Sequence, residues 1–138
     1  MDMEDVTKLM KEAGWGFLAT TDGKNVGVRP MGGWAWMEGE IWCASFKASE
    51  KVSQLQSVPY AEYCFCDKDA KHVRIAGPCT ISSDNDDKAR LYTAKPVLKD
   101  YIKDPTSPEY VVIRLKPENI RMMDPSDLKY RTIEPTRG

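Results

Sequence analysis

The spacing of apolar residues predicts a helix at the start of the chain, followed by short strands. The first segment repeats an apolar residue every three or four positions, at Met3, Val6, Leu9, Met10 and Ala13. Gly14 follows directly, and glycine commonly ends a helix because it adopts a left-handed backbone without strain. We therefore expect a helix from about residue 2 to residue 13.

Two hairpins are predicted next. Residues 15–31 read as strand, turn and strand around Asp22-Gly23, and Asp-Gly is a common signal for a β-hairpin turn. Residues 32–45 repeat the pattern, with Glu38-Gly39 at the turn. These two segments supply the first four strands.

Further strands alternate with short helices. Strands are expected within residues 61–67, 72–84, 110–117 and 119–123. In the third of these, the alternation predicts inward-facing Val111, Ile113 and Leu115 and outward-facing Val112, Arg114 and Lys116. One short helix is expected around Val52 and Leu55, before Pro59 ends it, and another after an N-cap at or near Asp84.

These elements predict a mainly β fold, a β-barrel or sandwich with α additions. Strands this short close into a barrel more readily than they form an open sheet with exposed edges. A chain of 138 residues is expected to form a single domain. We divide it into an N-terminal helix (1–14), the barrel (15–123) and a charged C-terminal tail (124–138) for which no regular structure is predicted.

The composition excludes several classes of protein. Hydrophobic residues make up 41% of the chain and charged residues 30%, as in soluble globular proteins, and the formal net charge is −1. A protein that grips nucleic acid or an anionic membrane needs a basic excess, so neither partner is expected. The chain has no apolar run long enough to span a bilayer and begins with an acidic amphipathic segment rather than a signal peptide, which predicts a cytoplasmic protein.

The four cysteines, Cys43, Cys64, Cys66 and Cys79, predict no metal site. Cys64 and Cys66 are two residues apart in a predicted strand, so they share a face, but metal-binding pairs usually have two to four intervening residues. His72 is the one histidine available as a nitrogen ligand. We interpret the cysteines as free, buried thiols.

The segment "SFKASEKVSQLQ", residues 45–56, combines features of an anion site. Ser49 fits the N-cap of the short helix, and Lys51 follows in its first turn, where a cation opposes the helix dipole unless an anion is bound there. A capped helix with a solvated lysine explains the same residues. Arg29, near a predicted sheet edge at Pro30, is a candidate second contact for a phosphate, or else a surface arginine paired with a carboxylate.

The order of three motifs resembles the pyridoxamine 5′-phosphate oxidase-like, FMN-binding split-barrel family, particularly its small general stress flavoproteins. The motifs are "GFLATTDGKNVGVRPM", "ASFKASEK" and "HVRIAGPCTISSD", and the resemblance runs from residue 15 to about 123. In the second motif, Ser49, Glu50 and Lys51 stand where the family typically has Ser-Arg-Lys. In the third, His72 replaces a glutamine and Gly77 closes the motif.

The resemblance implies a six-stranded antiparallel split barrel that forms a homodimer and binds FMN at the subunit interface. It further implies phosphate and ribityl contacts from Arg29, Ser45, Ser49 and Lys51. Backbone contacts along the flavin ring are implied for Arg29, Pro30 and Met31, and an approach to the ring or ribityl chain for His72. Trp15, Trp34, Trp36 and Trp42 fit either an aromatic wall for the flavin or the core and interface.

The implied function is an FMN-dependent oxidoreductase acting on a small molecule, with NADH or NADPH as a candidate electron donor. The end of the chain lacks the Arg-, His- and Trp-rich segment with which true oxidases bind pyridoxal substrates, which argues against pyridoxamine phosphate oxidation. Glu50 replaces an arginine contact, and its charge is expected to point outward. No catalytic acid or base is identified, although His72 is a candidate for proton transfer. The alternatives are a nitroimidazole-reductase-like protein, a haem- or deazaflavin-binding relative, a non-catalytic flavin-binding stress protein, and a barrel without cofactor.

Overall fold

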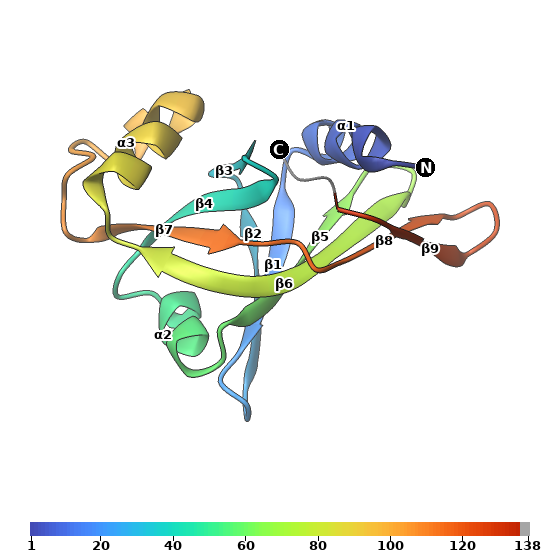
Figure 1. Cartoon of the computed structure of the whole chain (residues 1–138), viewed down its shortest axis with the longest axis horizontal. Coiled ribbons are helices and arrows are strands. Elements are labelled where there is room, and N and C mark those ends of the chain that lie inside the picture. The colour runs from blue at the N-terminus through green and yellow to red at the C-terminus, as the bar shows by residue number, and fades with distance from the viewer. Residues whose placement is uncertain (136–138) are drawn as a thin grey trace.

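The computed structural model describes residues 1–135, in which nine strands form one strongly curved antiparallel sheet (Figure 1). The strands are β1 (Gly16–Thr21), β2 (Val26–Met31), β3 (Trp34–Met37), β4 (Glu40–Phe46), β5 (Tyr60–Cys66), β6 (His72–Ser82), β7 (Tyr110–Leu115), β8 (Asn119–Asp124) and β9 (Lys129–Ile133). The helices are α1 (Met3–Ala13), α2 (Glu50–Ser57), α3 (Asn85–Ala94) and the 3-10 helix η1 (Pro96–Asp100).

The long strand β6 produces the curvature of the sheet. The strand order is β2-β1-β5-β6-β7-β4-β3, and β8 pairs with β6 and β9. Residues 72–76 of β6 pair with β8, whereas residues 79–82 pair with β7, so β6 joins the two halves of the sheet, which curl around a common core (Figure 1). The prediction of a mainly β split barrel with helical additions is confirmed. The described residues contain three strands more than the six that the resemblance implied.

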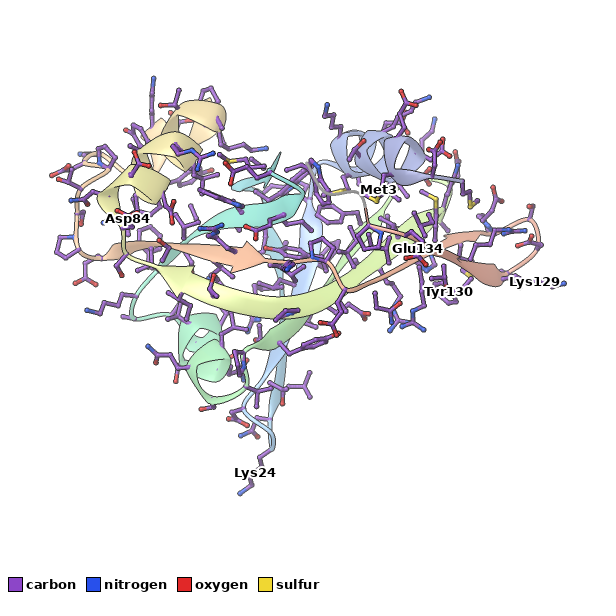
Figure 2. All side chains as sticks on the ribbon, viewed as in Figure 1. Met3, Lys24, Asp84, Lys129, Tyr130 and Glu134 are labelled. Atoms are coloured by element: carbon purple, nitrogen blue, oxygen red, sulfur yellow. The ribbon has the colours of Figure 1, made fainter. Side chains whose placement is uncertain are left out.

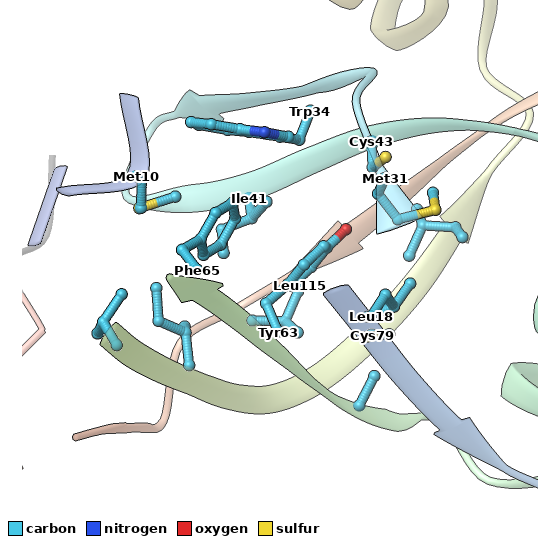
Figure 3. Close-up of a cluster of buried hydrophobic side chains, with 14 of the residues drawn as sticks. Met10, Leu18, Met31, Trp34, Ile41, Cys43, Tyr63, Phe65, Cys79 and Leu115 are labelled. Atoms are coloured by element: carbon cyan, nitrogen blue, oxygen red, sulfur yellow. The ribbon is translucent and has the colours of Figure 1, made fainter. Parts of the chain in front are cut away.

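The main core fills the inside of this curl. Figure 3 shows its centre, where Tyr63 and Phe65 of β5 lie among side chains from β1, β2, β4 and β7. α1 covers one end and buries Met3, Val6, Leu9 and Met10, the stripe expected from the sequence. Burial of such apolar side chains supplies most of the stabilisation of a fold of this kind.

A second core lies on the outer side of β4 and β7, where α3 and η1 pack. It consists of Trp42, Leu91, Leu98, Ile102, Tyr110 and Val112. Val112 therefore faces away from the main core, as predicted, but is fully buried rather than exposed. The sheet is covered on both faces here, so alternation along β7 does not separate apolar from polar positions.

The predicted helix ends are confirmed. Gly14 ends α1 with a φ of 76°, and the side chain of Asp84 accepts a hydrogen bond from the N–H of Asp86 at the start of α3. Ser49 caps α2 by accepting a hydrogen bond from the N–H of Val52. These caps satisfy backbone N–H groups that have no acceptor within the helix.

The last residues are more ordered than the sequence predicts. Within the tail 124–138, residues 129–133 form β9, which pairs with β8, while residues 136–138 lie outside the described part of the chain. None of the helices in residues 1–135 has the length and apolar character needed to cross a membrane.

Candidate functional site

A cavity of about 510 Å³ lies between the ends of β2 and β4, the start of α2, and η1. Its lining residues are Gly14, Trp15, Pro30, Met31, Gly32, Gly33, Ala44, Ser45, Phe46, Lys51, Val97, Leu98, Tyr101 and Ile102. The volume falls within the range of roughly 300–1,000 Å³ that is typical of small-molecule sites. Most of the lining is apolar, and Ser45 and Lys51 bring the polar groups at the α2 end, so the cavity suits a largely flat, apolar molecule with an anionic end.

The Gly32-Gly33 pair shapes one wall of the cavity. A Cβ atom at Gly32 would lie 2.7 Å from the ring of Trp15, and one at Gly33 would lie 2.9 Å from Cδ2 of Leu98. Both distances are shorter than ordinary van der Waals contact. Glycines here let the backbone after β2 approach the neighbouring walls closely, beside the cavity-lining Pro30 and Met31.

Lys51 brings an uncompensated positive charge to one end of the cavity. Within residues 1–135, no carboxylate lies within 4.0 Å of its amine in an ion pair. Burial lowers the pKa of Lys51, and the nearby charge of Arg29 lowers it further. A bound anion would remove both penalties, because it favours the protonated amine.

Two serine hydroxyls lie next to this lysine. Ser45, on β4, is buried, and its Oγ lies 3.3 Å from Oγ of Ser49, the N-cap of α2. The first N–H groups of α2 point toward the same end, where the helix dipole is positive. Ser45, Ser49 and Lys51, three of the residues predicted to bind phosphate, are thus brought together.

Arg29 lies near this group, but it binds protein groups and does not line the cavity. Its Nη1 donates to Oγ1 of Thr20 over 2.6 Å and to the carbonyl of Leu18 over 3.3 Å. Its Nη2 lies 3.1 Å from Oε1 of Glu50 on α2. The carboxylate of Glu50 thus points toward Arg29 and not simply outward, because the guanidinium of β2 reaches the first turn of α2.

The structure does not bring His72 to the α2 end of the cavity. This residue begins β6, and its Nε2 lies 2.8 Å from the hydroxyl of Tyr130 on β9. Figure 2 shows Tyr130 on the β8–β9 hairpin, well away from α2 in this view. Within one chain, His72 therefore contacts the C-terminal hairpin and does not line the cavity.

The comparison with known families agrees with this geometry. Residues 3–124 match the family model described as pyridoxamine 5′-phosphate oxidase. The chain belongs to this family. The match covers most of the sequence, including all strands from β1 to β8 and the whole of the cavity lining.

Solved structures of several bacterial proteins show a similar fold at low sequence identity. A NimC/NimA family protein from Clostridium acetobutylicum has a TM-score of 0.82 at 22% identity, with 94% of this chain and 90% of that chain covered. General stress protein 26 from Bacillus anthracis has a TM-score of 0.76 at 20% identity (94% and 96% covered). A pyridoxamine 5′-phosphate oxidase-related, FMN-binding protein from Nostoc punctiforme has a TM-score of 0.67 at 16% identity (96% of both chains covered). None of the curated proteins compared with this chain matches it.

One wall of the cavity was missed by sequence reasoning. This wall consists of Val97, Leu98, Tyr101 and Ile102, in and after η1. Their spacing, with apolar residues in adjacent pairs four apart, is a helical signal. Pro96, Pro105 and Pro108 make this stretch look like a loop in the sequence, but proline is well tolerated in the first turn of a helix, and Pro96 opens η1.

The tryptophans are divided between the core and the cavity. Trp34 and Trp42 are buried in the two cores, whereas Trp15 is 57% exposed and lines the cavity. Trp36 is half-buried against the main core. Trp15 is therefore the tryptophan whose ring is available to a ligand in the cavity.

The cysteines are free thiols, as predicted, but they are not all buried. Cys43 and Cys79 are buried, and loss of solvation raises the pKa of each thiol to about 12. Cys64 is half-buried and Cys66 is exposed, on the outer face of β5. In residues 1–135, no group of three or more potential ligands is placed to hold a metal ion.

Proposed function

We propose that this chain is an FMN-binding flavoprotein, and that it acts as a homodimeric FMN-dependent oxidoreductase on a small organic substrate. The observation that carries the proposal is Lys51, a partly buried amine with no carboxylate partner in the described residues, at the polar end of an otherwise apolar cavity. A flavin mononucleotide has matching chemistry, since it joins a flat ring system to a phosphate. The family assignment and the likeness to an FMN-binding protein support the same ligand.

The residues of the cavity fit this cofactor in kind. Lys51 and the hydroxyls of Ser45 and Ser49 would bind the phosphate, together with the first N–H groups of α2. Pro30 and Met31 would lie along the flavin ring, and Trp15 would pack against an aromatic system at the mouth of the cavity. Bound FMN would supply the hydride- or electron-transfer chemistry, while the chain orients it and limits access of water.

A homodimer is supported by the exposed outer face of the β1–β2 hairpin. Phe17 pairs with Pro30 across the hairpin, and Val26 and Val28 lie on the same face. Phe17 is 45% exposed, Val26 80% and Val28 67%. Exposed apolar groups clustered on a sheet face are typical of a protein interface. Pro30 also lines the cavity, so a second copy on this face would adjoin it. The partner's His72 is then the candidate for a contact that the single chain does not provide.

Titration of the purified protein with FMN tests the proposal. We expect quenching of flavin fluorescence with one FMN bound per chain, and a dimer by light scattering. Lys51→Ala combined with Arg29→Ala should weaken FMN binding at least about a hundredfold, because the charge-assisted contact of Lys51 and the nearby positive charge of Arg29 are both lost. Val28→Glu should dissociate the dimer, while Lys24→Glu at the hairpin tip should not.

Turnover is tested separately. The FMN-loaded protein should oxidise NADH or NADPH in the presence of an acceptor such as a quinone or a nitroimidazole. A protein that binds FMN tightly but transfers no electrons with any donor would instead be a flavin carrier. If the wild-type protein does not bind FMN even at high FMN concentration, the proposed function is wrong.

A further inference from the structure

Glu50 binds Arg29, whose positive charge lies near Lys51 at the polar end of the cavity. Oε1 of Glu50 lies 3.1 Å from Nη2 of Arg29. The pair joins β2 to the first turn of α2, the turn that also carries Lys51. With one positive charge from Arg29, one from Lys51 and one negative charge from Glu50, the net charge of the three residues is +1, whereas a phosphate monoester carries about −1.5 to −2 at pH 7.

We propose that Glu50 is a built-in counter-ion that competes with the phosphate of the ligand for Arg29. It thereby lowers the preference of this cavity for phosphorylated over unphosphorylated flavin. The inference rests on the proposed function, because it concerns the phosphate end of the same site. It goes beyond that function by assigning the ligand selectivity of this chain to one side chain.

The remaining hydrogen bonds of Arg29 explain why Glu50 and a phosphate would compete. Nη1 is held by the hydroxyl of Thr20 and the carbonyl of Leu18. The Thr20 hydroxyl in turn donates to the side chain of Gln54 on α2, and both of these residues are buried. Nη1 is therefore fixed, and Nη2, which carries no hydrogen bond in the described residues except that to Glu50, is a group that a ligand would share with this carboxylate. A phosphate that uses Nη2 meets a carboxylate already in place.

The local backbone leaves room for the ion pair. A Cβ atom at Gly27 would lie 2.7 Å from Oε1 of Glu50 and would also press on Nη2 of Arg29. The absence of a side chain at this position of β2 allows the pair to form against the strand. Because the side chain of Glu50 is still 72% exposed, it can move into solvent when a ligand arrives.

Parallel titrations with FMN and riboflavin test the inference, since the two ligands differ only in the phosphate. Glu50→Gln removes the charge and keeps the shape, so it should tighten FMN binding roughly three- to tenfold and change riboflavin binding less than about twofold. Glu50→Lys should tighten FMN binding further. The gain should shrink between 50 mM and 300 mM salt, because exposed charges are screened. The readout is fluorescence quenching and needs no turnover.

Glu4→Gln is the matched control. It makes the same change of charge on α1, which lies on the other side of the molecule from α2 (Figure 1), and should leave both affinities unchanged. Equal FMN affinities for wild type, Glu50→Gln and Glu50→Lys would overturn the inference and leave the proposed function in place. So would parallel gains for FMN and riboflavin. If none of the proteins binds either flavin, the proposed function fails, and the inference with it.

Discussion

The indole N–H of Trp34 donates a hydrogen bond to the carbonyl oxygen of Gly14 over 2.8 Å. Gly14 ends α1, and Trp34 begins β3 directly after the Gly32-Gly33 pair. The ring is buried and packs edge-on against Phe65 of β5. The bond therefore ties together two segments of chain that both line the candidate cavity.

Loss of this hydrogen bond should destabilise the fold. Trp34→Phe keeps an aromatic ring in the core but leaves the carbonyl of Gly14 without its donor, so we expect the free energy of unfolding to fall by about 1–2 kcal/mol. Urea denaturation measures it. Trp36→Phe, two residues along the same strand and half-buried, is the control and should cost less. Equal losses for the two variants would show that ring size, and not the hydrogen bond, sets the cost.

Lys51 makes the stability of the ligand-free protein depend on pH. Burial and the charge of Arg29 lower its pKa from the ordinary value of 10.5, so between the folded-state pKa and 10.5 the unfolded chain binds more protons than the folded chain. Stability then rises with pH through that window, because the penalty for a charged amine disappears. Below the folded-state pKa the penalty is fully present.

Lys51→Met tests this dependence. The variant should be more stable than wild type at pH 7 without ligand, and the difference should shrink as the pH approaches 10.5. Thermal unfolding of both proteins from pH 7 to pH 10.5 measures this difference in stability. The contributions of the other titrating groups cancel, because both proteins contain them. Saturating FMN should reverse the order, since the phosphate stabilises the charged amine of the wild type. A constant difference across the pH range would mean that packing alone distinguishes the two proteins.

The sequence predicted local features well where one short-range cause decides the structure. Ser49 and Asp84 were identified as caps because a side-chain oxygen satisfies a nearby N–H at the start of a helix. The turn at Glu38-Gly39 also forms, with φ angles of 55° and 73°. Ser45, Ser49 and Lys51 were grouped from their position at one helix start, and the structure places them together.

Long-range features were not visible in the sequence. The burial of Val112 depends on α3 packing over β7, which no pattern within β7 reports. The ion pair of Arg29 with Glu50 joins residues 21 positions apart. One lies on a strand and the other on a helix, and the sequence pattern does not predict how these two elements pack. The β9 strand forms because β8 offers a free edge, although its own residues are mostly polar and exposed.

Gly77 closes the third sequence motif, and the structure shows why this position requires glycine. A Cβ atom here would overlap the backbone carbonyl of Lys116 and lie 3.2 Å from the backbone nitrogen of Glu118. We expect Gly77→Ala to cost more than about 3 kcal/mol, or to prevent folding, because backbone atoms cannot move aside as a side chain can. Gly32→Ala meets only the exposed ring of Trp15 and should cost much less. Soluble yield and urea denaturation compare them; similar costs would contradict this explanation.

Arg114 fixes α3, and through it the η1 wall of the cavity, to the sheet. Its guanidinium lies 4.4 Å from the ring centroid of Trp42 and forms ion pairs with Glu40 (2.9 Å) on β4 and Asp87 (3.3 Å) on α3. Arg114→Gln would leave two partly buried carboxylates without their cation. We expect a loss of about 2 kcal/mol in the free energy of unfolding, together with weaker FMN binding, because η1 directly follows α3.

Arg131→Gln is the matched control for this change. Arg131 pairs with Asp127 on the exposed β8–β9 hairpin, and exposed ion pairs contribute about 0–1 kcal/mol. The free energy of unfolding of the control should therefore fall by no more than about 1 kcal/mol, and its affinity for FMN should be unchanged. Urea denaturation and FMN titration of both variants separate the two effects. If Arg114→Gln lost stability but bound FMN as wild type does, α3 would stabilise the fold without positioning the cavity wall.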